Sequence, residues 1–211
     1  MGKFITFEGP DGSGKTTQIC RLAAWLSAQG ADVLLTREPG GTEISEQIRN
    51  ILHDLNNKAM QPRAEILLYS AARAQLVAEK IKPHLAAGGV VLSDRYADST
   101  LAYQGYGHGL ELEALRLITA FATDHLQPDL TLLFDVDAET GLRRRLAGGG
   151  EWNRLDAYAL AFHQRVRAGY LELAQAEPER WVKLDAAQDV AALEAEVRRV
   201  VAARLNLSAF L

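Results

Sequence analysis

The sequence has little cysteine, no basic surplus and no long apolar run. Its 211 residues include one cysteine, Cys20, which excludes an internal disulfide framework and is typical of a reducing compartment. The chain has 23 Lys and Arg against 27 Asp and Glu, a formal net charge of −4, so it lacks the basic excess typical of nucleic-acid binders. No apolar run reaches the roughly 18–20 residues that a membrane span needs. We therefore expect a cytoplasmic protein with no nucleic-acid or membrane partner.

The remaining composition is that of a globular protein. It is 48% hydrophobic and 24% charged, and 211 residues suffice for one sizeable core but not for two full domains. Phe4 and Ile5 begin a strand-like segment almost at once, so we expect no secretory signal. The prediction is a single domain over residues 1–211.

Short apolar runs alternate with longer amphipathic stretches along the chain. They predict strands at 4–7, 33–36, 90–93, 130–134 and 181–184, and helices at about 14–29, 44–52, 64–85, 112–126, 158–174 and 190–205. Uninterrupted apolar strands separated by helices indicate an α/β fold, a five-stranded parallel sheet with helices on both faces. Ligands of such sheets bind at the carboxyl ends of the strands.

The segment after the first predicted strand matches a phosphate-binding motif. Gly9-Pro10-Asp11-Gly12-Ser13-Gly14-Lys15-Thr16 fits G-x-x-x-x-G-K-[ST] and opens a predicted helix. Its glycines let backbone N–H groups point inward, Lys15 would reach the β- and γ-phosphates, and the Thr16 hydroxyl would bind Mg²⁺. The predicted ATP-binding residues are Gly9, Pro10, Asp11, Gly12, Ser13, Gly14, Lys15, Thr16 and Thr17.

Other features separate the types of P-loop protein. The N-K-x-D motif of a GTPase and the L-S-G-G-Q signature of a transporter ATPase are both missing from the sequence. Instead, Arg37 and Arg95 directly follow the second and third predicted strands. Arginines at the rim of a phosphate site suit a bidentate grip on a second phosphorylated molecule. This pattern favours a nucleotide kinase, which must hold an acceptor phosphate against the γ-phosphate.

Three segments extend this interpretation. The P-loop, residues 36–41 (T-R-E-P-G-G) and residues 94–105 (D-R-Y-A-D-S-T-L-A-Y-Q-G) resemble bacterial thymidylate kinases in order and spacing over essentially the whole chain. The resemblance implies a P-loop kinase fold and the reaction ATP + dTMP → ADP + dTDP, for dTTP and DNA precursor synthesis. It also implies a Mg²⁺ cofactor, with ATP as co-substrate, and a homodimer.

The resemblance also implies a set of dTMP-binding residues. Asp11 would lie near the sugar 3′-hydroxyl, and three arginines would hold the acceptor phosphate. Tyr69 would pack on thymine, Arg73 would bond its carbonyl, and Tyr103 would exclude a ribose 2′-hydroxyl. The whole predicted set is Asp11, Arg37, Arg49, Tyr69, Arg73, Arg95, Thr100, Tyr103 and Gln104, in which Thr100 and Gln104 read the base edge.

Two acidic residues keep open interpretations. Asp94, at the end of the third predicted strand, either holds a Mg²⁺-bound water or is a structural partner of Arg95. Glu8 either lies behind the metal or accepts an N–H of the P-loop. The predicted metal residues are Thr16 and Asp94.

A lid is predicted at about residues 143–156. The family divides by whether a catalytic arginine lies in the P-loop or in this lid, and position 12 is glycine. The charge should therefore come from Arg143, Arg144, Arg145 or Arg154, and a glycine run at 148–150 should make the lid mobile. The predicted catalytic residues are Lys15, Asp11, Arg37, Arg95 and Arg154.

Two alternatives remain at this stage. One is a related kinase that prefers another nucleoside monophosphate. The other is a nucleotide-binding regulator or inactive homologue, whose lid has a glycine run at 148–150 in place of the basic tract of related lids and would allow binding of ATP and dTMP without turnover.

Overall fold

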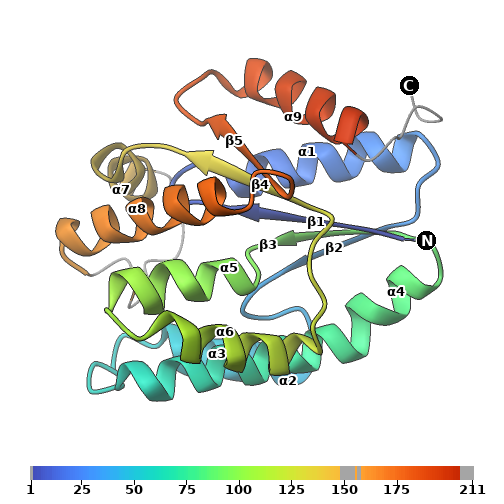
Figure 1. Ribbon diagram of the computed structural model, residues 1–211. Helices are drawn as coiled ribbons and strands as arrows, with labels where there is room; N and C mark the ends of the chain where they lie inside the picture. The colour runs from blue at the N-terminus through green and yellow to red at the C-terminus, as the bar shows by residue number, and fades with distance from the viewer. Residues whose placement is uncertain (1, 148–154, 156–157, 205–211) are drawn as a thin grey trace.

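Five parallel strands form one sheet in the computed structural model, which describes residues 2–147, 155 and 158–204 (Figure 1). The strand order is β2-β3-β1-β4-β5, and every neighbouring pair is parallel. The strands are β1 (Lys3–Glu8), β2 (Val33–Arg37), β3 (Val90–Asp94), β4 (Leu130–Asp135) and β5 (Trp181–Asp185). The predicted α/β fold class is confirmed, and each strand lies within two residues of its predicted bounds.

The register of the sheet brings the strand ends together. Phe7 pairs with Asp94, and Asp94 pairs with Arg37, so β1, β2 and β3 end at the same level. On the other side, Asp135 of β4 pairs with Asp185 of β5. The charged residues that end the five strands therefore lie along one edge of the sheet.

Helices cover both faces of the sheet. Their bounds are α1 (Lys15–Ala28), α2 (Glu43–His53), α3 (Pro62–Leu76), α4 (Lys82–Ala86), α5 (Ala97–Thr100), α6 (Leu112–Thr123), α7 (Ala138–Ala147), α8 (Leu160–Ala176) and α9 (Val190–Arg204). Two π-helical turns continue α3 and α5, η1 (Val77–Ile81) and η2 (Leu101–Gly107). Among the described helices, none is long and apolar enough to cross a membrane.

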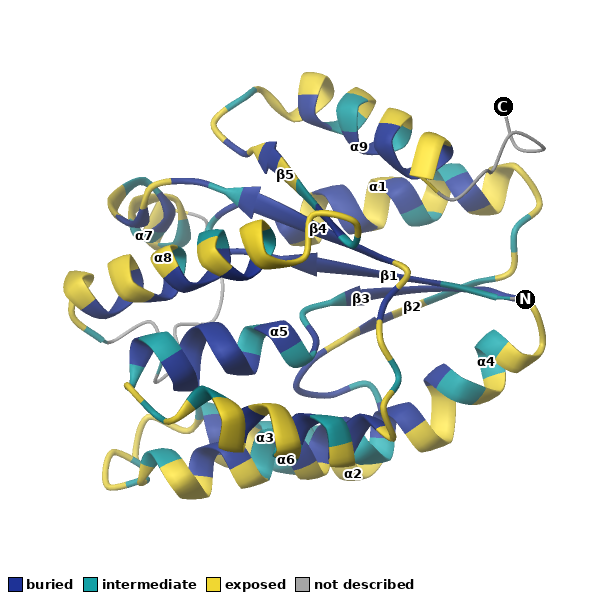
Figure 2. Cartoon of the chain, in the orientation of Figure 1, coloured by how far each residue is buried: buried dark blue, intermediate teal, exposed yellow. Residues whose placement is uncertain are grey.

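The core is divided by the sheet into layers. On one face, α1 and α9 pack Ile19 and Val197 against Ile5 and Leu132 of the strands. On the other face, η2 and α8 pack against β4 and β5, and Leu76 and the η1 turn pack against β1 and β3. Figure 2 shows the inner strands β1, β3 and β4 mostly buried between helices whose outer sides are exposed, whereas the edge strands β2 and β5 are partly exposed. This packing holds the strand ends, and the loops after them, in fixed positions.

The helical segment over α5 and η2 was not among the predicted helices. Most of its residues are buried, including Asp98, Thr100 and Leu101 to Gly105. A helix buried on nearly every side has no exposed polar stripe, so its sequence lacks the 3.6-residue period on which the prediction depends. The segment nevertheless carries several of the predicted site residues.

Candidate active site

The P-loop connects β1 to α1 at the carboxyl edge of the sheet. Gly9 has φ of 137°, and a Cβ on it would lie 2.4 Å from the Phe134 carbonyl oxygen of β4. Lys15 folds back over the loop, where its Nζ donates to the carbonyl oxygens of Gly9 (2.9 Å) and Pro10 (2.8 Å). The first turn of α1 contains no acidic residue, so its N–H groups and dipole favour an anion.

Burial and like charge weaken the proton affinity of Lys15. Burial of the ammonium, with the nearby charge of Arg95, lowers the pKa of Lys15 to about 8, although Asp11 and Asp94 oppose the shift. The ammonium group thus stays mostly charged at neutral pH, although burial and Arg95 disfavour its charge more than the nearby carboxylates favour it. A phosphate bound in the loop would supply the missing negative charge.

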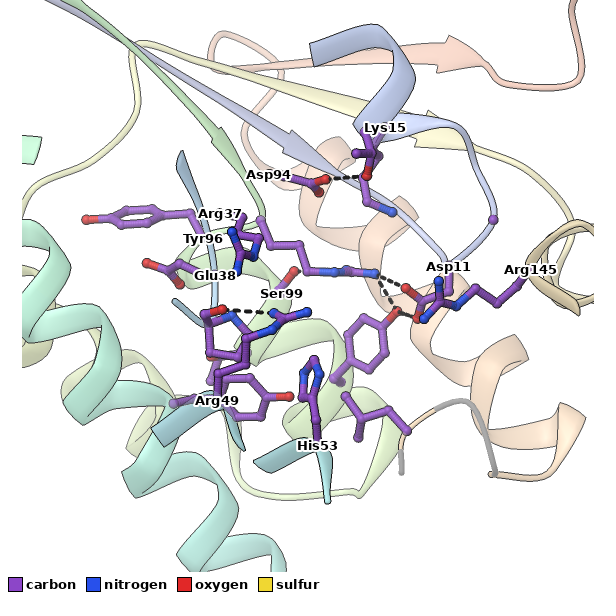
Figure 3. Close-up of a pocket in the computed structure, with 18 of the residues that line it drawn as sticks. Asp11, Lys15, Arg37, Glu38, Arg49, His53, Asp94, Tyr96, Ser99 and Arg145 are labelled. Atoms are coloured by element: carbon purple, nitrogen blue, oxygen red, sulfur yellow. Dashed lines mark hydrogen bonds and ion pairs between the residues drawn. The ribbon is translucent and has the colours of Figure 1, made fainter. Parts of the chain in front are cut away.

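Two oxygen ligands of the kind that Mg²⁺ prefers lie together at the start of α1. Thr16 Oγ1 donates to Asp94 Oδ2 at 2.7 Å, and both residues line the cavity described below (Figure 3). A hydroxyl and a carboxylate beside a phosphate cradle leave several positions for phosphate and water oxygens, which suits the octahedral preference of Mg²⁺. The donor set therefore fits the metal that the P-loop implies.

Arg95 lies at the centre of the site. Its Nη2 donates to Asp11 Oδ1 (2.6 Å) and to the Tyr103 hydroxyl (3.0 Å), while Nη1 reaches the Gly9 carbonyl oxygen (3.2 Å) (Figure 3). Its backbone has φ of 73°, a left-handed conformation that costs about 1–3 kcal/mol in a residue other than glycine. The Arg95 N–H donates to the Phe7 carbonyl oxygen at 3.0 Å, which anchors this turn to β1.

Asp11 is held in its charged form. Burial alone would raise the pKa of this carboxyl, but the charges of Arg95 and Lys15 and the Tyr103 hydroxyl hold it well below its ordinary value. Tyr103 donates to Asp11 Oδ2 at 2.6 Å. The carboxylate therefore accepts from two side chains and connects the P-loop to η2.

Glu8 forms a second, fully buried layer behind Arg95. Its Oε1 accepts the Tyr96 backbone N–H (2.7 Å), and its Oε2 accepts the hydroxyls of Ser99 (2.6 Å) and Tyr170 (2.9 Å). The same two hydroxyls accept from Arg95 Nη1, at 3.2 and 3.1 Å. Neither sequence interpretation of Glu8 described this contact set, which positions Arg95 from behind.

Arg37 and Arg49 lie at the rim. Both oxygens of Glu46 accept from Arg37 Nη2, at 2.9 and 3.0 Å, and Arg49 Nη1 donates to the Pro39 carbonyl oxygen at 2.9 Å. The turn between β2 and α2 that brings them there includes a cis peptide bond at Glu38–Pro39. Figure 3 shows both arginines on the same side of the cavity as His53.

Arg73 occupies the buried end. It is 2% exposed and its Nε donates to Glu38 Oε2 at 2.7 Å. Its remaining nitrogens reach Thr100 Oγ1 (3.0 Å) and the Tyr96 carbonyl oxygen (3.1 Å). This side chain joins α3 to the turn after β2 and to α5.

These groups surround a cavity of about 500 Å³. The predicted site residues that line it are Asp11, Gly12, Gly14, Lys15, Thr16, Thr17, Arg37, Arg49, Tyr69, Arg73, Asp94, Arg95, Thr100, Tyr103 and Gln104. Gly9, Pro10 and Ser13 are not among its lining residues; the Lys15 ammonium contacts all three. Arg154 lies outside the described residues, so its position in the lid stays a prediction.

The sequence interpretation did not assign several residues of the site. Glu38, Pro39, His53, Tyr96, Ser99 and Leu155 also line the cavity. Glu38 and Tyr96 adjoin predicted arginines at strand ends, so position alone could have indicated them. Tyr170 carries no such local signal, because α8 meets the site only through the tertiary fold.

The described part of the predicted lid begins in α7. Arg144 and Arg145 line the cavity, and Arg145 points into it from α7 (Figure 3). Arg144 Nη1 also donates to the Ala186 carbonyl oxygen at 2.7 Å, whereas Arg143 Nη2 contacts Thr140 Oγ1 at 3.3 Å. Position 12 has no room for a side chain, since a Cβ on Gly12 would lie 2.0 Å from the Gly141 carbonyl oxygen of α7.

A P-loop at the end of β1, facing arginines at the ends of β2 and β3 across one cavity, defines an ATP-dependent nucleoside monophosphate kinase of the P-loop fold. The family model for thymidylate kinase matches residues 7–197. The chain belongs to the thymidylate kinase family. The resemblance inferred from the sequence is confirmed.

Individual relatives agree with this assignment. The chain is 54% identical to a thymidylate kinase of Roseiflexus sp. (strain RS-1), over 95% of this chain and 94% of the relative. It is 52% identical to a thymidylate kinase of Deinococcus radiodurans, over 97% and 98% of the two chains. The crystal structure of thymidylate kinase from Ehrlichia chaffeensis superposes with a TM-score of 0.78 at 35% identity, covering 95% of this chain and 98% of that one.

Proposed function

We propose that this protein transfers the γ-phosphate of ATP to dTMP, giving dTDP for dTTP and DNA precursor synthesis. The observation that carries the proposal is the cavity itself. Its lining includes Lys15 of the P-loop, Arg37 and Arg95 at the strand ends, and the buried Arg73. A triphosphate donor and a monophosphate acceptor can therefore face each other inside one cavity.

On the donor side, Gly9 to Thr17 would bind ATP. Lys15 would leave the loop carbonyls, to which it donates in this structure, and neutralise the β- and γ-phosphates. When bound by Thr16, Asp94 and the phosphates, Mg²⁺ would neutralise charge that develops during transfer. The hydrogen bond between Thr16 and Asp94 supports this assignment.

On the acceptor side, the nucleophile is an oxygen of the dTMP phosphate. A phosphate dianion is nucleophilic at neutral pH, so positioning and charge neutralisation are the main tasks of the protein. Arg37, Arg49 and Arg95 would hold this phosphate, and Asp11 would orient Arg95 and meet the sugar. Hydrogen bonds to Glu46, Pro39 and Asp11 position these three arginines, which supports their role in holding the phosphate.

The nucleoside would occupy the inner end of the cavity. Tyr69 would pack on thymine, and Arg73, Thr100 and Gln104 would contact its polar edge. Tyr103 would lie beneath the sugar. In this arrangement the side chains nearest the base come from α3, α5 and η2, and the buried core sets the mutual positions of α3 and η2.

The lid would complete the site. We propose that a mobile segment at about 143–156 closes over the phosphates and supplies a positive charge, with Arg154 as the predicted catalytic residue. The close approach of Gly12 to Gly141 supports a lid source, because no side chain fits at position 12 of the P-loop.

We also propose a cytoplasmic homodimer with no nucleic-acid or membrane partner. Support comes from an apolar surface on α3 and α6, which pack side by side. It includes Leu67 (58% exposed), Leu117 (68%) and Phe121 (87%). Clustered large apolar side chains on a soluble chain commonly mark a protein interface.

The proposal is tested by ADP release from Mg²⁺-ATP with dTMP, dUMP, UMP, CMP, AMP and GMP as separate acceptors. We expect turnover with dTMP, weaker turnover with dUMP and none with the purines. Preference for another monophosphate would support the related-kinase alternative. Binding of ATP and dTMP without turnover would identify a nucleotide-binding regulator instead.

A further inference from the structure

A buried carboxylate lies directly behind one of the predicted base-reading side chains. Gln104 of η2 lines the cavity, and its Nε2 donates to Glu65 Oε1 of α3 at 2.6 Å. Glu65 is 1% exposed, and His108 Nε2 lies 3.4 Å from the same carboxylate oxygen. A charged residue buried to this degree, on the far side of a site residue, needs a physical reason.

The reason follows from donor and acceptor chemistry. An amide has one donating and one accepting end, whereas an ionised carboxylate only accepts. Glu65 therefore takes the NH₂ group of Gln104, which leaves the carbonyl oxygen of that amide for the cavity. Without such a partner, the amide could present either end to a ligand.

The neighbouring side chain has the opposite polarity. Arg73 only donates, and Glu38 fixes its orientation through the 2.7 Å bond to Nε. Thr100 links these two side chains: its hydroxyl accepts a hydrogen bond from Arg73, and it directly precedes η2, which carries Gln104. Two buried carboxylates thus orient the side chains at the base end of the cavity: Glu38 orients the donor Arg73, and Glu65 orients Gln104 as an acceptor.

We propose that Glu65 is a specificity-determining positioning residue, which holds the Gln104 carbonyl toward the base and so selects pyrimidines with an N3–H and a 4-oxo group. This inference rests on the proposed function and deepens it. A 4-oxo group accepts from Arg73, and N3–H donates to Gln104. A 4-aminopyrimidine reverses both groups, so it would meet a donor with a donor and an acceptor with an acceptor.

The test compares dTMP with dCMP in the Glu65→Gln variant, which keeps the shape of the side chain. Its amide can donate to Gln104, so Gln104 can turn its NH₂ toward the base. We expect the dTMP:dCMP ratio, in both kcat/KM and calorimetric Kd, to fall at least about tenfold. The KM for ATP should stay at its wild-type value.

A matched control exists on the surface. Gln75 Nε2 donates to Glu79 Oε2 at 2.8 Å in an exposed pair of the same chemistry. Glu79→Gln should leave the dTMP:dCMP ratio unchanged. In a Gln104→Ala background, Glu65→Gln should have no further effect on the ratio, because the side chain it orients is gone.

Three results would overturn the inference: a folded Glu65→Gln variant with the wild-type ratio, an equal effect in the Gln104→Ala background, or a Gln104→Ala variant that loses dTMP and dCMP equally. The last result decides the matter even if Glu65→Gln does not fold. The wild-type assay distinguishes failure of this inference from failure of the proposed function, because only the second would appear as wild-type protein that does not turn over dTMP.

Discussion

Arg95 shows how single residues build this site. The residue has a strained backbone, and its guanidinium donates to groups from the P-loop, α5, η2 and α8. Because those partners come from four segments, the side chain is held in place before any ligand arrives. Pre-organised charge of this kind favours phosphoryl transfer, since no reorganisation is needed at the moment of reaction.

Replacement of Tyr103 by alanine should relax the discrimination against UMP. The buried ring lines the cavity. In the proposed arrangement it lies beneath the sugar, where a ribose 2′-hydroxyl would collide with it. We expect the ratio of kcat/KM for dTMP to that for UMP to fall roughly tenfold or more. Tyr103→Phe keeps the ring and loses the hydroxyl that bonds Asp11 and Arg95, so it should retain the deoxy preference. An unchanged ratio in Tyr103→Ala would contradict the assignment.

The buried Glu8 should make stability depend on pH. Burial, with the nearby charge of Asp98, raises the pKa of Glu8 from 4.5 to about 7. Between these values the folded state binds more protons than the unfolded state, so the free energy of unfolding falls as pH rises. From pH 5 to pH 8 this amounts to about 2 to 3 kcal/mol.

Glu8→Gln should remove that dependence. Chemical unfolding of both proteins at several pH values gives the difference in their free energies of unfolding. We expect the free energy of unfolding of the wild type to fall relative to that of Glu8→Gln as pH rises. A difference that stays constant from pH 5 to pH 8 would show that Glu8 is ionised throughout.

At the scale of elements, the P-loop and α7 are packed so closely that each limits the other. A Cβ on Gly141 of α7 would lie 2.6 Å from the Asp11 carbonyl oxygen, and position 12 faces the same contact. The arginines of α7 are thereby placed at different distances from the site. Arg145 faces the cavity, and Arg143 contacts Thr140 on its own helix.

Arg154→Ala should lower kcat by roughly a hundredfold while it raises the KM for dTMP much less, because a charge that acts mainly in the transition state contributes to kcat. Arg143→Ala is the matched control and should stay near wild type. Steady-state kinetics with saturating Mg²⁺-ATP would measure both. A wild-type kcat for Arg154→Ala would remove this residue from the mechanism, and Arg145→Ala would then carry the loss.

At the scale of the whole molecule, the sheet separates two layers with different surfaces. The outer surface of the layer formed by α1 and α9 carries charged pairs such as Arg21–Glu194. The layer with α3 and α6 exposes large apolar side chains instead. This asymmetry is what a dimer through the second layer would produce.

Phe121→Glu should convert the proposed dimer to a monomer. In the dimer, the new carboxylate of each protomer would be buried without a cationic partner. It would also lie near the same carboxylate of the second protomer across the two-fold axis, and the two negative charges would repel each other. Light scattering after gel filtration should show the mass fall from twice 23.1 kDa to 23.1 kDa. Val190→Glu changes an exposed apolar residue of α9 and should keep the dimer. A wild-type protein that is already monomeric would contradict the proposal.

The amino-acid sequence by itself determined the sheet, the P-loop and the arginines at the strand ends. Each depends on residues close together in the chain: an apolar run, a glycine pattern or a charged residue directly after a strand. These local patterns predicted the P-loop residues, Arg37, Asp94 and Arg95, whereas the dTMP-binding residues of the helices came from the resemblance to thymidylate kinases. The local patterns missed the helix over α5 and η2, because a helix that is buried on nearly every side lacks the 3.6-residue alternation of apolar and polar residues.

Only the tertiary structure decided which buried groups stand behind those residues. Tyr170 reaches Glu8 across 162 positions of sequence, and Gln104 reaches Glu65 across 39. The approach of Gly141 to Gly12 joins segments that no local pattern connects. A hydrogen-bond partner of this kind is set by the packing of helices on the sheet, so neither spacing nor residue type reveals it in the sequence.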